Sequence, residues 1–292
     1  MMSNPKTQLL FIGLALLLVC CSRPYSKEQI DLLFEPITSK YGIEIVYEID
    51  ETFTPIFMGG GGAHAEYCTL EPNEKHIIVR YPQILEEALA KYPVHVINNY
   101  LNAIYFAGII EIRGLYAGGT FDSTRRIVYL VEDGSGPVHR SIANFHHEFS
   151  SLLLSRHGRL INPWLEQHPE GFRYRNQMYE DSKDVYADTS VFGTKADYEK
   201  GFMNPYGQTN FENDFNEYAA MVFAYPEEFK QIMDQYPRVR GKFLVFLDFY
   251  QKIDPIFTEE YFFGTRASDH DNHPASSADC GESPSSAGAR LK

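Results

Sequence analysis

The chain has 292 residues and a formal net charge of −13, and 44% of its residues are hydrophobic. This length and hydrophobic content are enough to bury a sizeable core in one domain. The negative charge argues against a nucleic-acid partner, because a phosphate backbone would be repelled.

The N-terminus has the form of a secretory signal. A single early cation, Lys6, precedes an apolar run from Leu9 to Val19. This run is too short to span a bilayer in the usual way and has the length of a signal-peptide core. We therefore expect residues 1–20 to be a signal peptide.

The end of the apolar run resembles a bacterial lipobox, in which a cysteine that follows a small residue is acylated. Cys21 fits this role better than Cys20, because the β-branched Val19 precedes Cys20. The alternative is that both cysteines belong to a signal that is simply removed. We expect acylation at Cys21, which would make the protein a lipoprotein of the bacterial cell envelope, held to the outer membrane by its acyl chains.

The body of the chain is expected to be one domain, residues 21–266, followed by a disordered tail. Residues 267–292 are rich in Ser, Ala, Gly, Pro and Asp, a composition that cannot offset the entropy of ordering. The Gly59–Gly62 run lacks the Lys-Ser/Thr of a phosphate-binding loop and is expected to be a flexible loop. Cys68 and Cys280 could form a disulfide in an oxidising compartment.

The local patterns predict a mixed α and β fold. Ser26 can cap a helix that runs to about Lys40, and a β-branched strand follows at Ile43–Ile49. A helical stretch is expected from about Gln83 to Ala107, with an interruption near Pro93. Two further strands are expected at residues 109–117 and 125–131, and the glycine-rich segment between them reads as a turn.

A helix with a signal at each end follows the last of these strands. Pro137 suits its first turn, and Gly158 suits the position after its last turn. Apolar residues recur along it at helical spacing and predict a core-facing stripe: Ile142, Phe145, Phe149, Leu152 and Leu153.

The same helix contains half of a zinc-hydrolase motif. In H-E-x-x-H, two histidines one turn apart bind zinc and the glutamate acts as general base. Here His147 and Glu148 match, but Ser151 stands where the second histidine belongs. His146 lies about 100° round the helix from His147, so it is expected to serve binding rather than metal ligation, or else to be an interior histidine.

A later segment supplies a possible third ligand. Thr209 and Glu212 have the spacing of a capping box at the start of a helix. Its apolar stripe is Phe211, Phe215, Tyr218, Val222 and Tyr225. Glu217 lies off that stripe, on a face shared with Asp214 and flanked by small residues, as a zinc-binding carboxylate would.

Three motifs together resemble a known family. F-H-H-E-F-x-x-x-L, with G-F-x-N-x-Y and D-F-x-E-Y downstream, is similar to the zinc-binding metallopeptidase-like lipoproteins of bacterial envelopes, in the zincin-like superfamily. The resemblance covers about residues 109–263. It implies a zincin-like α+β fold, with a small sheet packed against the motif-bearing helix and a helical C-terminal half.

The resemblance also implies roles for particular residues. His147 and Glu217 would hold zinc, with Ser151 or a water completing the shell, and Glu148 would take the proton of the attacking water. Tyr206 or Tyr218 would steady the oxyanion. Because Ser151 replaces a strong ligand, zinc is expected to be weakly bound or absent.

Two functions are therefore considered. One is a peptide-bond hydrolase with an atypical H-E-x-x-S site. The other is a non-catalytic lipoprotein of the same fold, which binds a peptide, a glycan or a partner protein.

Overall fold

The computed structural model describes residues 25–49, 68–72, 75–112, 115–132, 138–158, 161–175 and 191–264. The expectations for the signal peptide, Cys21, Gly59–Gly62, Pro137 and the C-terminal tail lie outside these residues. The possible Cys68–Cys280 disulfide does too, since the side chain of Cys68 is not described.

The first helix begins and ends where the sequence predicts. Helix α2 (Lys27–Tyr41) starts with a capping box in which the Ser26 hydroxyl accepts from the Gln29 backbone and the Gln29 side chain accepts from the Ser26 backbone. It ends at Gly42, whose φ of 63° is left-handed and favours glycine. The inner face of α2 is buried through Ile30, Phe34, Ile37 and Tyr41.

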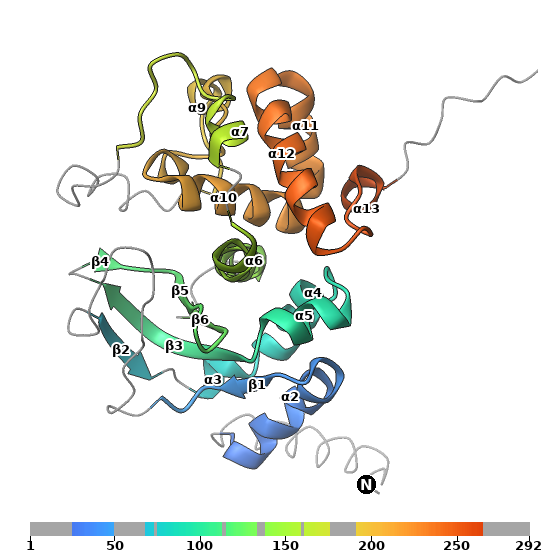
Figure 1. The fold of residues 1–292 in the computed structure, drawn as a ribbon. Coiled ribbons are helices and arrows are strands. Elements are labelled where there is room, and N and C mark those ends of the chain that lie inside the picture. Colours follow the sequence, from blue (N-terminus) through green and yellow to red (C-terminus); the bar gives the residue numbers. More distant parts are fainter. Residues whose placement is uncertain are drawn as a thin grey trace, which may run out of the picture.

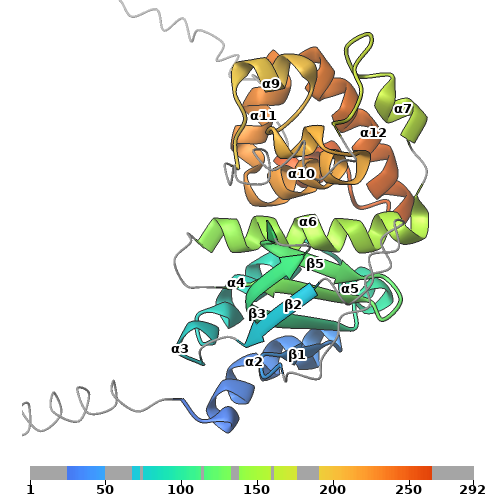
Figure 2. The same cartoon turned by 90° about the vertical axis from the view of Figure 1, so that its left-hand side faces the viewer.

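A small mixed sheet is built around one long strand, β3 (Ala103–Ile112). Strands β1 (Glu44–Val46) and β6 (Ile127–Val131) are parallel to it, and β2 (Cys68–Pro72) and β4 (Leu115–Tyr116) are antiparallel. The path β1-β3-β6-β5 ends at β5 (Gly119–Asp122), which is antiparallel to β6. One face of this sheet receives the motif-bearing helix (Figure 2).

Three sequence expectations in this half were wrong in extent. The predicted strand at residues 109–117 covers the end of β3 and a separate strand, β4, which is antiparallel to it. The predicted helical stretch holds α4 (Tyr81–Leu89) and α5 (Val94–Tyr100), preceded by the short α3 (Lys75–Ile78), but its last residues belong to β3. The apolar run from Ala103 was compatible with either structure, and pairing with β1 and β6 on both sides decides for strand. The predicted strand at residues 43–49 is shorter, because only Glu44–Val46 pairs with β3.

The glycine-rich segment predicted as a turn contains the edge strand β5. Gly119 is required there by close packing rather than by a turn. A Cβ at this position would lie 2.8 Å from the Tyr129 backbone oxygen and 2.9 Å from Cγ of Glu148. Glycine therefore lets β5 approach both its partner strand and the motif-bearing helix.

Helix α6 (Val138–His157) carries the H-E-x-x-S motif and lies between the sheet and the C-terminal helices (Figures 1 and 2). Its predicted apolar stripe is buried along its whole length. The helix ends at His157, and the Gly158 backbone N–H donates to the Leu154 carbonyl, as the sequence predicts for its C-terminal glycine.

The C-terminal half is helical. Its described elements are α7 (Ile161–Leu165), α9 (Lys195–Lys200), the 3₁₀ turn η3 (Tyr206–Gln208), α10 (Phe211–Ala224), α11 (Pro226–Gln235), α12 (Pro237–Ile253) and α13 (Glu259–Phe263). Helix α10 crosses directly over α6 (Figure 1). Within the described residues, no helix is long and apolar enough to cross a membrane.

The start of α10 differs from the predicted capping box. Asn210 is the N-cap, and its side chain accepts from the Asn213 backbone N–H at 2.8 Å. Thr209 instead donates to the Tyr206 carbonyl. The side chain of Glu212 is thereby free to reach across to α6.

The architecture confirms the predicted α+β class. A small sheet packs against the motif-bearing helix, and the C-terminal half is helical. Helix α10 is buried on all sides from Asp214 to Phe223, because it lies between α6 and the outer helices. Every polar side chain in that stretch therefore needs a partner inside the protein.

Candidate functional site

The candidate site lies where α6 faces α10. His147 Nδ1 is 3.0 Å from Glu217 Oε1, and both side chains are about nine-tenths buried. The sequence predicts that these two side chains converge, since both lie off the apolar stripes of their helices. The structure brings them together.

A loop before α10 completes the surroundings of Glu217. The Asn204 side-chain amide donates to Glu217 Oε2 at 2.5 Å, while its oxygen accepts from the Gly207 backbone N–H. The ring of Tyr206, in η3, lies 5.8 Å from the ring of His147. Both carboxylate oxygens of Glu217 are thus occupied by protein groups.

Ser151 makes two hydrogen bonds that are separate from the His147–Glu217 contact. Its hydroxyl donates to Glu212 Oε1 at 2.8 Å and accepts from the Asn216 side-chain amide at 2.6 Å. Ser151 is 2% exposed and Asn216 is fully buried. A serine therefore stands where the H-E-x-x-H motif has its second histidine. Its hydroxyl is hydrogen-bonded to two side chains of α10.

Glu148 lies beside the edge strand β5, where Gly119 leaves room for its side chain. Burial raises the pKa of the Glu148 carboxyl to about 7; the nearby His147 opposes the shift, and the charges of Glu212 and Glu217 add to it. A carboxyl with a pKa near neutrality can accept or donate a proton at physiological pH. This is the property expected of a general base.

The pKa of His147 is shifted in the opposite sense from that of an isolated buried histidine. Burial lowers the pKa of His147, but the hydrogen bond to Glu217 and the charges of Glu148, Glu217 and Glu212 outweigh it, so the net shift is upward. The carboxylates around His147 thus favour the protonated form of its ring, while burial opposes it.

Two residues expected near the site lie elsewhere. His146 is fully buried on the other side of α6, where its Nδ1 bonds to the Tyr92 hydroxyl and its ring stacks on Phe223. Burial drives the pKa of His146 well below its usual value. His146 is therefore an interior histidine, the second of the two possibilities that the sequence left open, and it is not part of the His147 site. Tyr218 is also buried, and its hydroxyl donates to the Gly201 carbonyl.

The residues present do not fit a zinc ion. Zinc sites in proteins use three or four strong donors around one point. Here His147 and Glu217 bond to each other, and Ser151 offers a neutral hydroxyl that already bonds to Glu212 and Asn216. Across the part of the chain that the structure describes, no group of three or more His, Cys, Asp or Glu could hold a metal.

Asp214 shares a helix with Glu217 but belongs to a different cluster. Its Oδ2 atom accepts from Lys242 Nζ at 2.6 Å, and it is also contacted by the polar groups of Trp164, His168 and Tyr174. Asp214 and Lys242 are both fully buried. This ion pair ties α10 to α12 and has no contact with the His147 site.

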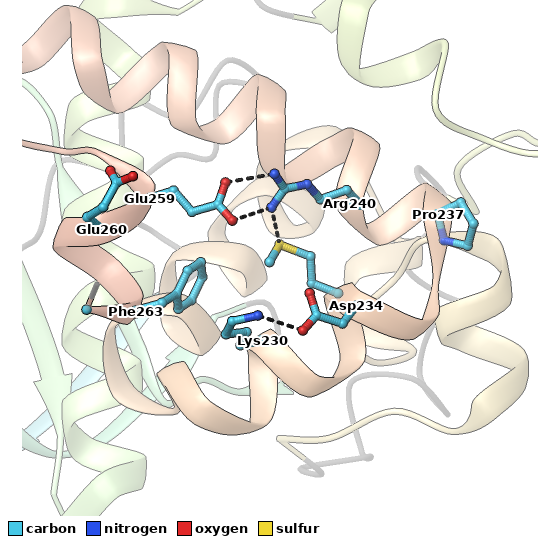
Figure 3. A pocket seen from close by; sticks show the side chains of 9 residues that line it. Lys230, Asp234, Pro237, Arg240, Glu259, Glu260 and Phe263 are labelled. Atoms are coloured by element: carbon cyan, nitrogen blue, oxygen red, sulfur yellow. Dashed lines mark hydrogen bonds and ion pairs between the residues drawn. The ribbon is translucent and has the colours of Figure 1, made fainter. Parts of the chain in front are cut away.

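A surface pocket of about 700 Å³ lies well away from the site, between α11, α12 and α13 (Figure 3). Arg240 faces it and bonds to both carboxylate oxygens of Glu259 at 2.7 Å, and Lys230 pairs with Asp234 at 2.6 Å. These charges are matched within the protein, and nothing in the pocket resembles the H-E-x-x-S site.

The sequence missed four residues of the site: Gly119, Asn204, Glu212 and Asn216. Asn204 is the asparagine of the G-F-x-N-x-Y motif, but its position in that motif does not indicate which residue its side chain contacts. Glu212 was assigned to a helix cap that Asn210 forms instead. No local signal identifies Glu212, because its partner Ser151 lies 61 residues earlier in the chain.

Comparisons with known proteins support the fold. No family model matches the chain, and no curated protein matches it significantly in sequence. The structure is similar to a crystal structure from Bacteroides caccae ATCC 43185 that is described as a putative zinc-binding metallo-peptidase, with a TM-score of 0.51 and 14% sequence identity. The match covers 81% of this chain and 95% of that chain. At this identity the likeness is one of fold: the chain shares the overall architecture of that structure.

Proposed function

We propose that the protein is a non-catalytic, lipid-anchored relative of zincin-like metallopeptidases, which binds a peptide, a glycan or a partner protein. One observation carries the proposal. Ser151, at the position of the second zinc ligand, is hydrogen-bonded to Glu212 and Asn216 in the contact between α6 and α10. A hydrogen-bonded network replaces the metal-binding group.

The remaining motif residues are consistent with this proposal. Zinc affinity arises from several ligands together, so losing one of three strong ligands weakens binding by orders of magnitude. His147 and Glu217 satisfy each other without a metal. Glu148 would have no metal-bound water to activate, and its carboxyl would serve instead as a hydrogen-bonding group of the site.

Metal analysis of the purified protein tests the proposal. The wild type, purified without added metal, should contain well under one zinc per chain. Ser151→His should raise zinc occupancy, because a histidine at this position lies one helical turn from His147 on the same face. Ser155→His is the matched control, since Ser155 lies one turn further along α6 and is exposed; it should leave the zinc content unchanged.

Stoichiometric zinc in the wild type would overturn the non-catalytic reading and restore hydrolysis of peptide bonds as the function. Low zinc in both the wild type and Ser151→His would show that His147 and Glu217 cannot complete a site. The relationship to metallopeptidases would then be one of fold alone.

The anchoring half of the proposal has support from the sequence at Cys21, which ends a lipobox-like segment. Labelled palmitate should be incorporated into the wild type and lost in Cys21→Ala. Cys20→Ala is the matched control, because it removes the neighbouring thiol and should keep the label. Absence of label from the wild type would remove the lipid anchor, and with it the placement in the outer membrane.

A further inference from the structure

Strand β1 lies at the edge of the sheet that is far from the candidate site. The path β1-β3-β6-β5 places β1 at one end and β5, where Gly119 makes room for Glu148, at the other. Within the described residues, β1 pairs only with β3. The outer edge of β1 therefore carries backbone groups that no described strand uses.

The ladder to β3 determines which backbone groups of β1 face outward. The Glu44 N–H donates to the Asn102 carbonyl at 2.8 Å, and Glu44 pairs in register with Ala103. In a parallel pair, alternate residues of a strand bond to the partner. Glu44 and Val46 therefore face β3, and the N–H and C=O of Ile45 face away from it. An unpaired donor and acceptor on a strand edge are a template for another strand.

A groove of about 630 Å³ opens beside this edge, between β1 and α2. The two elements lie side by side in both views (Figures 1 and 2). Phe34 of α2 stacks against Tyr47, with ring centroids 6.3 Å apart, and the Tyr47 hydroxyl donates to Asp31 at 2.6 Å. These contacts fix the α2 wall of the groove relative to β1, so a ligand does not have to order it.

The described residues that line the groove include apolar side chains and two carboxylates, and no cation. Phe34 and Ile45 are apolar, and Asp31 and Glu44 are acidic. Asp31 is already paired with Lys27 at 3.0 Å. The exposed Glu44 has no cationic partner among the described residues. The charge that is left unmatched in the groove is therefore negative.

We propose that the outer edge of β1 binds an extended segment of a partner protein, which adds a strand to the sheet and places a lysine or arginine beside Glu44. The outward N–H and C=O of Ile45 select an extended backbone, since only a strand can bond to both and continue along the groove. Opposite charges on neighbouring strands stabilise the pairing.

Charge also decides against a second copy of this chain as the added strand. Each copy carries a net charge of −13 and would bring its own unmatched Glu44 to the contact. A basic segment meets the opposite situation. This binding site is separate from the His147 site, and it requires neither zinc nor the lipid anchor.

Fluorescence anisotropy of a labelled synthetic peptide, titrated with the full-length protein, tests the proposal. The peptide has about seven residues, within the usual length of a strand, and valine alternates with lysine along it. Ile45→Pro removes the outward N–H and leaves the ladder to β3 in place, because proline is tolerated on strand edges. Ile45→Thr is the matched control, since threonine is β-branched and keeps the N–H. We expect the wild type and Ile45→Thr to bind alike, and Ile45→Pro to bind at least about tenfold more weakly.

Methylated peptides distinguish strand pairing from other modes of binding, and they decide the question on the wild type if Ile45→Pro does not fold. N-methylation of every second amide removes either the donors that face β1 or those that face away. One of the two methylated peptides should lose binding, and the other should keep it. A peptide with glutamate in place of lysine should bind at least about tenfold more weakly than the lysine peptide.

Four results would overturn the proposal. The first is no binding of the lysine peptide to the wild type at about 1 mM. The second is equal affinity for the wild type and a folded Ile45→Pro, and the third is equal loss of binding in both methylated peptides. The fourth is equal affinity for the lysine and glutamate peptides, which would exclude a basic partner. The zinc and palmitate measurements depend on none of these results, so this proposal and the proposed function can fail separately.

Discussion

Helix α10 carries two buried polar clusters only three residues apart, and they differ in charge balance. Asp214 faces α12 and pairs with one buried cation, Lys242. Glu217 faces α6, where it shares a small region with Glu148 and Glu212 and with one imidazole, that of His147. The first cluster is matched in charge, whereas the second has more carboxylates than cations.

The difference in charge balance indicates that the Asp214 cluster is structural and that the Glu217 cluster is the candidate functional site. In the Asp214 cluster, Lys242 is surrounded by aromatic rings, with its Nζ 3.9 Å from the centre of the Phe202 ring. Its partners close it off completely from solvent. The Glu217 cluster retains partial exposure at His147 and Glu148, and the pKa of the Glu148 carboxyl is raised. Surplus like charge in a partly open region is destabilising, and such arrangements gather at functional sites.

The largest expected effect comes from breaking the matched cluster. Lys242→Met leaves the Asp214 carboxylate buried without its counter-charge, and we expect a loss of about 3–5 kcal/mol in the free energy of unfolding. Urea denaturation measures it. The double variant Asp214→Asn with Lys242→Met removes both charges and should recover part of the loss, which keeps the test informative if the single variant does not fold.

Lys252→Met is the matched control for Lys242→Met. It breaks an ion pair of similar length with Asp248 on the same helix, but both side chains are more than half exposed. Its cost should be at most about 1 kcal/mol. If Lys242→Met lowered the free energy of unfolding no more than Lys252→Met, the buried Asp214–Lys242 ion pair would not stabilise the packing of α10 against α12.

The two clusters also show where sequence reasoning succeeded and where it stopped. Helical spacing correctly placed His147 and Glu217 off their apolar stripes, and facing helices brought them together. The same spacing grouped Asp214 with Glu217 on one face, yet their side chains reach different helices. Since α10 is buried on all sides, small differences in direction decide the partner, and those depend on packing with α6 and α12 rather than on the helix itself.

Long-range pairing explains the other errors. Ala103 to Ala107 became strand because β1 and β6 pair with it, and β5 formed in a segment whose glycines suggested a turn. The sequence predicts that Ser151 is a poor zinc ligand, and the structure adds the contacts that its hydroxyl makes. Its partners, Glu212 and Asn216, lie more than sixty residues away in the chain, so no local pattern could have identified them.

A second prediction concerns the carboxyl of Glu148, whose pKa is raised mainly by burial. Its pKa is about 7 in the folded protein and is raised from a usual value of 4.5. Between these values the folded protein keeps a proton that the unfolded chain has lost. The free energy of unfolding should therefore fall as the pH rises from about 4.5 through 7.

Glu148→Gln should remove that part of the pH dependence. Relative to the wild type, the variant should gain about 2 kcal/mol between pH 4.5 and pH 8, a value that allows for the partial exposure of the side chain. Denaturation at a series of pH values measures the gain. Glu227→Gln, at an exposed position of α11, is the control. Identical slopes for Glu148→Gln and the wild type would mean that burial does not raise the pKa of the Glu148 carboxyl.

The smallest effect is expected from Ser151→Ala, which tests whether the network that occupies the second ligand position is preorganised. The variant removes the donor to Glu212 and the acceptor for the buried Asn216 amide. We expect a loss of about 1 kcal/mol in the free energy of unfolding, because Asn216 is left without this partner while Glu212 can turn to water. Ser155→Ala is the control, since the Ser155 hydroxyl donates only to the Leu152 carbonyl of its own helix and is exposed. A Ser151→Ala variant as stable as Ser155→Ala would indicate that the serine merely fills space, and the replacement of the metal by a network would lose its physical basis.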